Sequence, residues 1–265
     1  MELGISGLVI PADWSLDETL DRMQEAGYTA LELALRDTGW FSLESSDADL
    51  RAIADRARAA GVTLTSVCPS VGSRPRDLMT SDAEARAAGI ETLTHCMRLA
   101  EGVGVDTVLV ALGQLTPELY YDQAYANARD AMRRLMPAAE QTGVRLAVEY
   151  VWNKFLLSPM EMARFLDEIG SPNAGFFFDS GNMAVFGYPE HWVRICGKHL
   201  MAVHVKDFRR AGYAWTPLLE GDVDFAAVMR ELRALGFDGP LISEVGPDCA
   251  SYADTADAIR RIAAM

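Results

Sequence analysis

The run Leu146-Ala147-Val148-Glu149-Tyr150-Val151 is apolar and strand-like, and it contains one carboxylate, Glu149. Three later apolar runs end on polar side chains in the same way, at residues 175–179 (GFFFD), 201–207 (MAVHVKD) and 241–244 (LISE). In chain order, the four runs supply Glu149, Asp179, His204 and Glu244. Strands that are apolar throughout are typical of a parallel sheet with both faces covered. The pattern therefore favours an α/β fold that can bring these four side chains together.

Strand-like and helix-like segments alternate eight times along the chain. Strands are expected at residues 3–10, 29–35, 62–67, 106–112, 145–151, 174–179, 200–208 and 240–245. Helices are expected at residues 15–27, 47–60, 81–100, 121–142, 158–169, 189–196, 225–235 and 254–264. Eight such units in about 250 residues favour a (β/α)8 TIM barrel over an open doubly wound sheet. No linker or shift in composition marks a second domain, so we expect one barrel domain over residues 1–265.

The composition limits the classes of partner. The formal net charge is -14 and no basic run is present, so nucleic acid is not an expected partner. No apolar stretch approaches the roughly 18 residues of a membrane span, and the first residues lack a signal-peptide pattern. The four cysteines form no CxxC motif, so we expect free, mostly buried thiols. These features predict a soluble, cytoplasmic protein.

The four polar side chains are candidates for a metal site. In a barrel of this kind the active site lies at the carboxyl ends of the strands, and all four fall at or near such ends in consecutive units. Each one alone could be a helix cap, an ion-pair partner or a core histidine. Carboxylates buried together raise one another's pKa, and a divalent cation removes that cost. The oxygen-rich set favours one Mn²⁺ or Mg²⁺ per chain, with Co²⁺ or Zn²⁺ as alternatives.

The contexts of these residues, AVEY, FDSGN, HVKD and SEVG, resemble a known family. They are similar to the xylose isomerase-like barrels of the sugar phosphate isomerase/epimerase group, which includes ketose 3-epimerases, inosose isomerases and hydroxypyruvate isomerase. The resemblance covers the whole chain. It implies that Glu149 and Glu244 bind a metal and also move protons, and that Asp179 and His204 are metal ligands.

The resemblance and the ligand set together predict the chemistry. A metal that chelates a carbonyl oxygen and a neighbouring hydroxyl acidifies the hydrogen on the carbon that bears this hydroxyl. One carboxylate can remove that proton to leave an enediolate, and a second can return a proton on the other face. We therefore expect an isomerase or epimerase of a small sugar, keto-sugar or keto-inositol. The same site would serve a dehydratase (lyase) of a keto-sugar, an inosose or a dehydroshikimate-like acid.

Four residues are candidates for contacting the substrate: Asn182, Lys206, Arg210 and Trp14. Asn182 stands where many relatives have a histidine, and an amide can bond a hydroxyl group but cannot shuttle a proton. A helix cap or turn is an equal alternative for Asn182, and a solvated loop charge is one for Arg210. Lys206 could instead pair with Glu149 or Glu244. Trp14, Trp40, Trp152 and Trp215 follow expected strands and could form aromatic walls or pack loops onto the barrel.

Two further classes of function remain to be weighed. An endonuclease IV-like DNA-repair enzyme would need additional histidine ligands, whereas His95, His191 and His199 are expected on helices or helix ends. The other class is a metal-binding scaffold without enzymatic activity. The complete set of four candidate ligands argues against it. The expected partner is a small polyhydroxy carbonyl substrate, and neither nucleic acid nor a membrane is an expected partner. The sequence is also compatible with a homo-oligomer, either a dimer or a tetramer.

Overall fold

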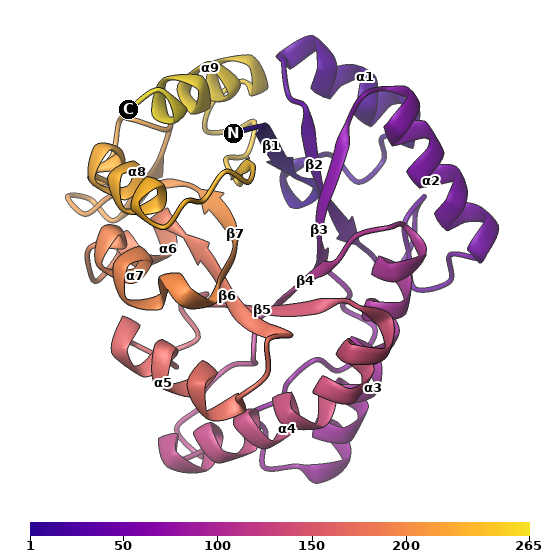
Figure 1. Cartoon of the computed structure of the whole chain (residues 1–265), viewed down its shortest axis with the longest axis vertical. Helices are drawn as coiled ribbons and strands as arrows, with labels where there is room; N and C mark the ends of the chain where they lie inside the picture. Colours follow the sequence, from indigo (N-terminus) through magenta and orange to yellow (C-terminus); the bar gives the residue numbers. More distant parts are fainter.

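The computed structural model describes all 265 residues and confirms the expected (β/α)8 barrel. Its strands are β1 (Leu3–Ser6), β2 (Ala30–Leu35), β3 (Thr63–Pro69), β4 (Thr107–Val110), β5 (Arg145–Glu149), β6 (Ala174–Asp179), β7 (Leu200–Val205) and β10 (Leu241–Ser243). They close in the order β1-β10-β7-β6-β5-β4-β3-β2, and each pairs with its neighbours in parallel (Figure 1). The chain thus joins its last strand to its first.

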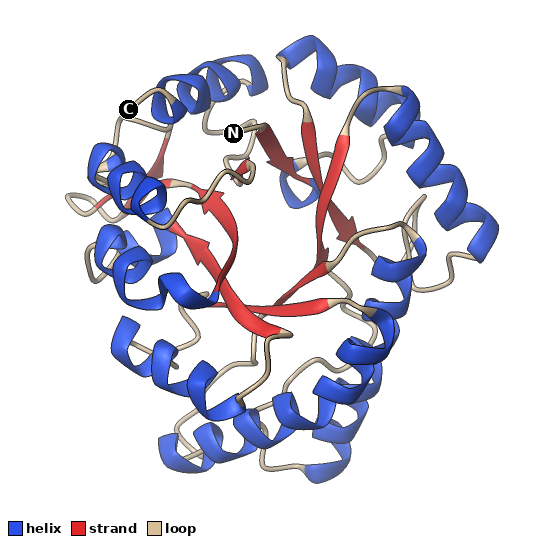
Figure 2. Ribbon diagram, in the orientation of Figure 1, coloured by secondary structure: helices blue, strands red, loops and turns tan.

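Helices form a ring outside the strands, as Figure 2 shows. They are α1 (Leu16–Ala26), α2 (Asp47–Ala59), α3 (Ala83–Gly102), α4 (Tyr121–Thr142), α5 (Pro159–Ile169), α6 (Ser180–Ala184), α7 (Pro189–Cys196), α8 (Phe225–Ala234) and α9 (Tyr252–Ala263), with short 3-10 turns η1 (Gly7–Val9) and η2 (Gly197–His199). The start of α1 is capped, because the Ser15 hydroxyl accepts the Glu18 N–H at 3.1 Å. None of these helices has both the length and the apolar character that a membrane crossing would need.

Six of the eight predicted strands are shorter than expected. The strand predicted at 3–10, for example, ends at Ser6, because η1 begins at Gly7. Two other differences bear on the site. The strand predicted at 145–151 ends at Glu149, since Trp152 and Lys154 adopt positive φ angles of 64° and 63° that an extended strand excludes. The strand predicted at 200–208 ends at Val205, and the chain then forms a separate antiparallel hairpin of β8 (Asp207–Arg209) and β9 (Ala214–Thr216). Both changes occur at the carboxyl end of the barrel.

A small apolar cluster fills the barrel interior. It takes one residue from each of six strands: Cys68, Leu109, Ala147, Phe177, Ala202 and Ile242. Four of these lie two positions before Glu149, Asp179, His204 and Glu244, and side chains two apart on a strand share a face. The inward face of the barrel therefore continues from an apolar floor directly to the polar set. As predicted, no cysteine is bridged, and Cys68, Cys96 and Cys196 are buried.

Candidate metal centre

The four polar side chains meet at the carboxyl end of the barrel. Each of Glu149, Asp179, His204 and Glu244 offers one ligand atom, and all four atoms lie within 4.8 Å of one another. Asp179 and His204 are fully buried, Glu149 is 5% exposed, and the Glu244 side chain is 12% exposed. This is the spatial cluster that the strand-end pattern predicted.

His204 is oriented by a buried carboxylate on the far side of its ring. Its Nε2 lies 2.9 Å from Glu32 Oε1, whereas its Nδ1 lies 3.4 Å from Glu149 Oε1 and 3.8 Å from Asp179 Oδ2. A carboxylate that holds one ring nitrogen fixes which nitrogen is free to bind a metal. Nδ1 is therefore the nitrogen that faces the candidate ligand set.

Glu32 lies behind His204. The sequence favours a structural ion pair over a cavity-lining role for Glu32, and its contact with His204 is such a pair. It is fully buried, and it accepts hydrogen bonds from Ser6 Oγ at 2.6 Å and Ser66 Oγ at 2.8 Å. Burial alone would raise the pKa of its carboxyl, but the charge and hydrogen bond of His204 hold the pKa below its usual range. The only sequence signal was a charged residue inside an apolar strand.

Asp179 has one carboxylate oxygen that makes no hydrogen bond. Its Oδ1 accepts the Asn182 N–H at 2.8 Å and so caps α6, but Oδ2 is buried and makes no hydrogen bond. A buried carboxylate oxygen in that state is costly unless a cation neutralises it. The unsatisfied atom and the mixed oxygen and nitrogen donor set both fit a divalent metal ion.

Lys206 is the basic group of the site. Its Nζ forms an ion pair with Glu244 and lies 3.5 Å from Asp179 Oδ2, and it sits 4.8 Å from the centre of the Trp215 ring. Burial alone would lower the pKa of this amine, but the surrounding carboxylates hold the pKa above its usual range. The pairing with Glu244 was one of the alternatives that the sequence left open for Lys206.

The site retains protons when it contains no cation. Burial, with smaller contributions from Glu244 and Asp179, raises the pKa of the Glu149 carboxyl to about 8 against the opposing effect of His204. For His204, burial would lower the pKa, but Glu32, Glu244 and the hydrogen bond to Glu149 hold it well above its usual value. Metal ligation requires a deprotonated carboxylate and a neutral imidazole, so a bound metal ion would displace these protons.

A cavity opens onto this cluster, and we call it the metal cavity. Its polar lining consists of Arg76, Glu149, Asn182, Lys206 and Glu244, and its apolar lining includes Leu8, Pro69, Leu109 and Val151. Asn182 donates from Nδ2 to Glu149 Oε1 at 3.2 Å. Two of the four predicted substrate contacts, Asn182 and Lys206, therefore face the cavity beside the candidate ligands.

The other two predicted substrate contacts lie elsewhere. The Arg210 guanidinium donates to the carbonyl groups of Ala184 at 2.9 Å and Gly187 at 2.6 Å, and it stacks over the Tyr188 ring at 5.3 Å. Trp14 packs edge-on against Tyr252, with ring centres 6.1 Å apart. Neither side chain lines the metal cavity in this structure.

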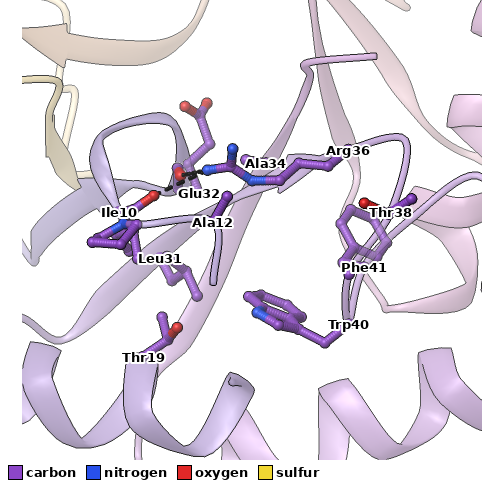
Figure 3. A pocket seen from close by; sticks show the side chains of 13 residues that line it. Ile10, Ala12, Thr19, Leu31, Glu32, Ala34, Arg36, Thr38, Trp40 and Phe41 are labelled. Carbon is purple, nitrogen blue, oxygen red and sulfur yellow. Dashed lines mark hydrogen bonds between the residues drawn. The ribbon is translucent and has the colours of Figure 1, made fainter. Parts of the chain in front are cut away.

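A second, smaller hollow lies beside β2 and is separate from the metal cavity. Figure 3 shows Trp40 pointing into it and Arg36 reaching across it. Arg36 donates to the carbonyl groups of Gly7 at 2.8 Å and Ile10 at 3.1 Å, so it ties the segment after β1 to the end of β2. Trp40 therefore lines this hollow, whereas Trp152 and Trp215 stack on each other at 4.9 Å next to Lys206.

The chain matches one family model and is similar to several known proteins. Residues 20–264 match the family model described as xylose isomerase-like TIM barrel. L-ribulose-5-phosphate 3-epimerase UlaE from Salmonella paratyphi A is 25% identical over 251 residues, which cover 94% of this chain and 88% of that protein.

Two solved structures share the fold. D-psicose 3-epimerase from Clostridium cellulolyticum H10 has a TM-score of 0.80 at 16% identity, with 99% of each chain covered. The 3-keto-D-glucoside 4-epimerase YcjR from E. coli has a TM-score of 0.81 at 15% identity, with both chains covered completely, at 100%.

Proposed function

The chain belongs to the xylose isomerase-like TIM-barrel family, and on that premise we propose that it is a metal-dependent epimerase or isomerase of a ketose or keto-sugar. The observation that carries the proposal is the cluster of four ligand atoms within 4.8 Å of one another at the end of a cavity. The named relatives are sugar epimerases, and none of these three is described as a lyase. The dehydratase alternative therefore has no specific support.

We propose that one divalent ion per chain is held by Glu149, Asp179, His204 and Glu244, with Mn²⁺ or Mg²⁺ favoured over Co²⁺ or Zn²⁺. When bound, such an ion would polarise the substrate carbonyl and acidify the hydrogen on the adjacent carbon. The residues fit this role because Glu32 leaves His204 Nδ1 facing the carboxylates and Asp179 Oδ2 lacks a hydrogen bond.

Glu149 and Glu244 are the proposed proton carriers. Glu149 has a pKa near 8 in the metal-free chain, which places its proton affinity close to neutral pH. In the proposed reaction one carboxylate removes the proton next to the carbonyl, and the other returns a proton to the opposite face of the enediolate. Lys206 holds Glu244 by its ion pair, and Asn182 holds Glu149 by its amide hydrogen bond.

Asn182 and Lys206 are also the proposed contacts for substrate hydroxyl groups, because both face the cavity. Direct contact of Trp14 and Arg210 with substrate stays a prediction, as do the domain extent 1–265, the cytoplasmic location and the oligomeric state. An endonuclease IV-like activity has no support from the site, since His204 is its only histidine ligand.

Solvent exchange tests the proposed reaction. The Mn²⁺-loaded protein is incubated in D2O with L-ribulose, its 5-phosphate, D-psicose and D-tagatose, and deuterium at C3 is followed by NMR. We expect exchange and the C3 epimer for at least one substrate, and loss of both in Glu149→Gln and Glu244→Gln. A product with a new enone absorbance would identify a dehydratase instead. No exchange on any ketose or keto-inositol would contradict the proposal.

A further inference from the structure

Arg76 is a cation in the metal cavity that has no acidic partner. It comes from the segment between β3 and α3 and lines the same cavity as Glu149 and Glu244. Its one hydrogen bond runs from the guanidinium to the Pro69 carbonyl, which leaves most of its five N–H donors free. The neighbouring Arg74 is different, because it is exposed and lies 3.8 Å from the Glu44 carboxylate.

The metal cavity has two chemically different sides. The candidate metal ligands come from β5, β6, β7 and the residue after β10, on one side of the barrel. Asn182 and Lys206 line the cavity on that same side. The lining residues from the first half of the chain include the apolar Leu8, Pro69 and Leu109, and Arg76 is the only charged residue among them. A substrate whose carbonyl end meets the metal ligands would extend its other end toward Arg76.

The segment that carries Arg76 is fixed at both ends. Before it, the Asp37 carboxylate accepts backbone N–H groups of Gly72 at 2.8 Å and Ser73 at 3.2 Å. After it, Asp77 accepts the backbone N–H groups of Met79 at 2.8 Å and Thr80 at 3.0 Å. These bonds fix the backbone on either side of Arg76, so little further ordering of the segment is needed when a ligand binds.

Lys206 is not available for the same task. Its amine is already paired with Glu244 and lies 3.5 Å from Asp179, so it balances charge within the ligand cluster. A guanidinium that is planar, always charged and only partly bonded is suited to a phosphoryl group or a carboxylate, which it can bind with two parallel hydrogen bonds. An uncharged hydroxyl group cannot accept two parallel hydrogen bonds from the guanidinium and does not balance its charge.

We propose that Arg76 binds an anionic group, a phosphoryl group or a carboxylate, at the end of the substrate remote from the metal ligands. The inference rests on the proposed function for the reaction at the other end, and it narrows the substrate class to anionic ketoses. Arg76 is in this account a specificity-determining residue that takes no part in proton transfer.

The kinetic test compares L-ribulose, L-ribulose 5-phosphate and a ketohexuronate on wild type and Arg76→Gln. For the anionic substrate that fits, we expect kcat/KM of Arg76→Gln to fall about 10- to 100-fold, mainly through KM, because one charged interaction is lost. Turnover of the uncharged ketose by Arg76→Gln is expected to fall by a much smaller factor, because that substrate carries no anionic group for Arg76 to bind. Arg74→Gln, from the same segment, is the matched control and is expected to behave as wild type. If Arg76→Gln impairs turnover of L-ribulose 5-phosphate, the bound group is a phosphoryl group; if it impairs turnover of the ketohexuronate, the bound group is a carboxylate.

A binding test does not depend on turnover. Inorganic phosphate is titrated calorimetrically into the metal-loaded wild type, Arg76→Gln, Arg76→Lys and Arg74→Gln. We expect wild type and Arg74→Gln to bind, Arg76→Lys to bind more weakly and Arg76→Gln not to bind. Equal losses on charged and uncharged substrates, or phosphate binding unchanged by Arg76→Gln, would overturn the inference. A third outcome is that phosphate binding requires Arg76 but no substrate shows deuterium exchange at C3. That outcome would overturn the proposed reaction and leave this inference standing.

Discussion

At the scale of single residues, Glu32 determines how His204 is presented to the other candidate ligands. The 2.9 Å contact with Nε2 and the two serine hydroxyls on Glu32 make a buried chain that ends at the ligand cluster. A carboxylate behind a ligating imidazole fixes its orientation and increases its basicity. The arrangement therefore links β1, β2 and β3 to a site whose ligands all come from the second half of the chain.

The Glu32→Gln variant tests this role. We expect the affinity for Mn²⁺ to fall about 10- to 100-fold, because the amide removes the charge that supports the imidazole. Isothermal titration calorimetry of the purified variant measures the effect, with Glu91→Gln on the exposed face of α3 as the matched control. Unchanged Mn²⁺ affinity in a folded Glu32→Gln protein would show that Glu32 has only a packing role.

Glu149 makes metal binding depend on pH. Its pKa in the metal-free chain is raised from 4.5 to about 8, chiefly by burial, so its proton must leave when a metal binds below pH 8. We expect the apparent Mn²⁺ affinity to rise at least about tenfold for each pH unit up to that value and less steeply above it, because His204 must lose its proton as well. Calorimetry in two buffers of different ionisation enthalpy measures the proton release. Affinity that is flat between pH 6 and 8 would contradict this account of Glu149.

The same shift has a consequence for the stability of the metal-free protein. The folded state holds the Glu149 proton more tightly than the unfolded state does, so the stabilisation is present at low pH and is lost as pH rises from 4.5 to about 8. Added metal is expected to oppose this loss of stability at higher pH, because a metal ion binds the deprotonated form of Glu149.

At the scale of elements, the β8–β9 hairpin covers the basic group of the site. Trp215 on β9 lies 4.8 Å from Lys206 Nζ and stacks on Trp152 at 4.9 Å with a 17° angle between the rings. Trp152 in turn donates its indole N–H to the Asn182 carbonyl at 3.1 Å. The hairpin, the segment after β5 and α6 are therefore joined through aromatic contacts at one side of the metal cavity.

Removal of the Trp215 ring tests the hairpin. Trp215 is 43% exposed, so we expect Trp215→Ala to cost about 1–2 kcal/mol of unfolding free energy, less than a fully buried aromatic residue would. Trp215→Phe, which keeps a ring over Lys206, is expected to lose less than half of that. Urea unfolding followed by circular dichroism measures both variants. Equal losses for Ala and Phe would mean that the ring contacts with Lys206 and Trp152 are not what stabilises the hairpin.

The elements also show what the sequence could predict. The eight strands and most helices follow from apolar runs and capping residues, and α4, β6 and α7 have the predicted ends. Helix α6 was missed because Ser180–Ala184 is too short to show helical periodicity. Its cap is Asp179, for which a helix cap was an alternative to the favoured role of metal ligand. The hairpin was missed because its two strands have three residues each and pair across a turn.

At the scale of the whole molecule, barrel closure explains which site residues could be predicted. The four candidate ligands lie on strands that are consecutive in the sheet, or directly after the last one, so their meeting follows from the strand order. Glu32 and His204 are 172 positions apart and lie on β2 and β7, which do not pair. Their contact crosses the barrel interior and required the three-dimensional structure.

Side-chain direction limited the prediction in a second way. Trp14 and Arg210 lie in the predicted segments, yet their side chains pack against Tyr252 and against the carbonyl groups of Ala184 and Gly187. Arg76 was not considered as a site residue because it lies in an irregular segment far from the strand-end motifs. Loops over a barrel end are placed by tertiary contacts, which a single sequence does not reveal.

The central claim is that the closed barrel assembles one metal site from Glu149, Asp179, His204 and Glu244. Equilibrium dialysis of the purified, chelator-treated protein against Mn²⁺, followed by elemental analysis, tests it most directly. The account predicts one tightly held ion per chain in wild type, and loss of that ion in folded Asp179→Asn and His204→Ala proteins. Wild-type protein that retains no divalent metal, or variants that retain as much as wild type, would contradict it.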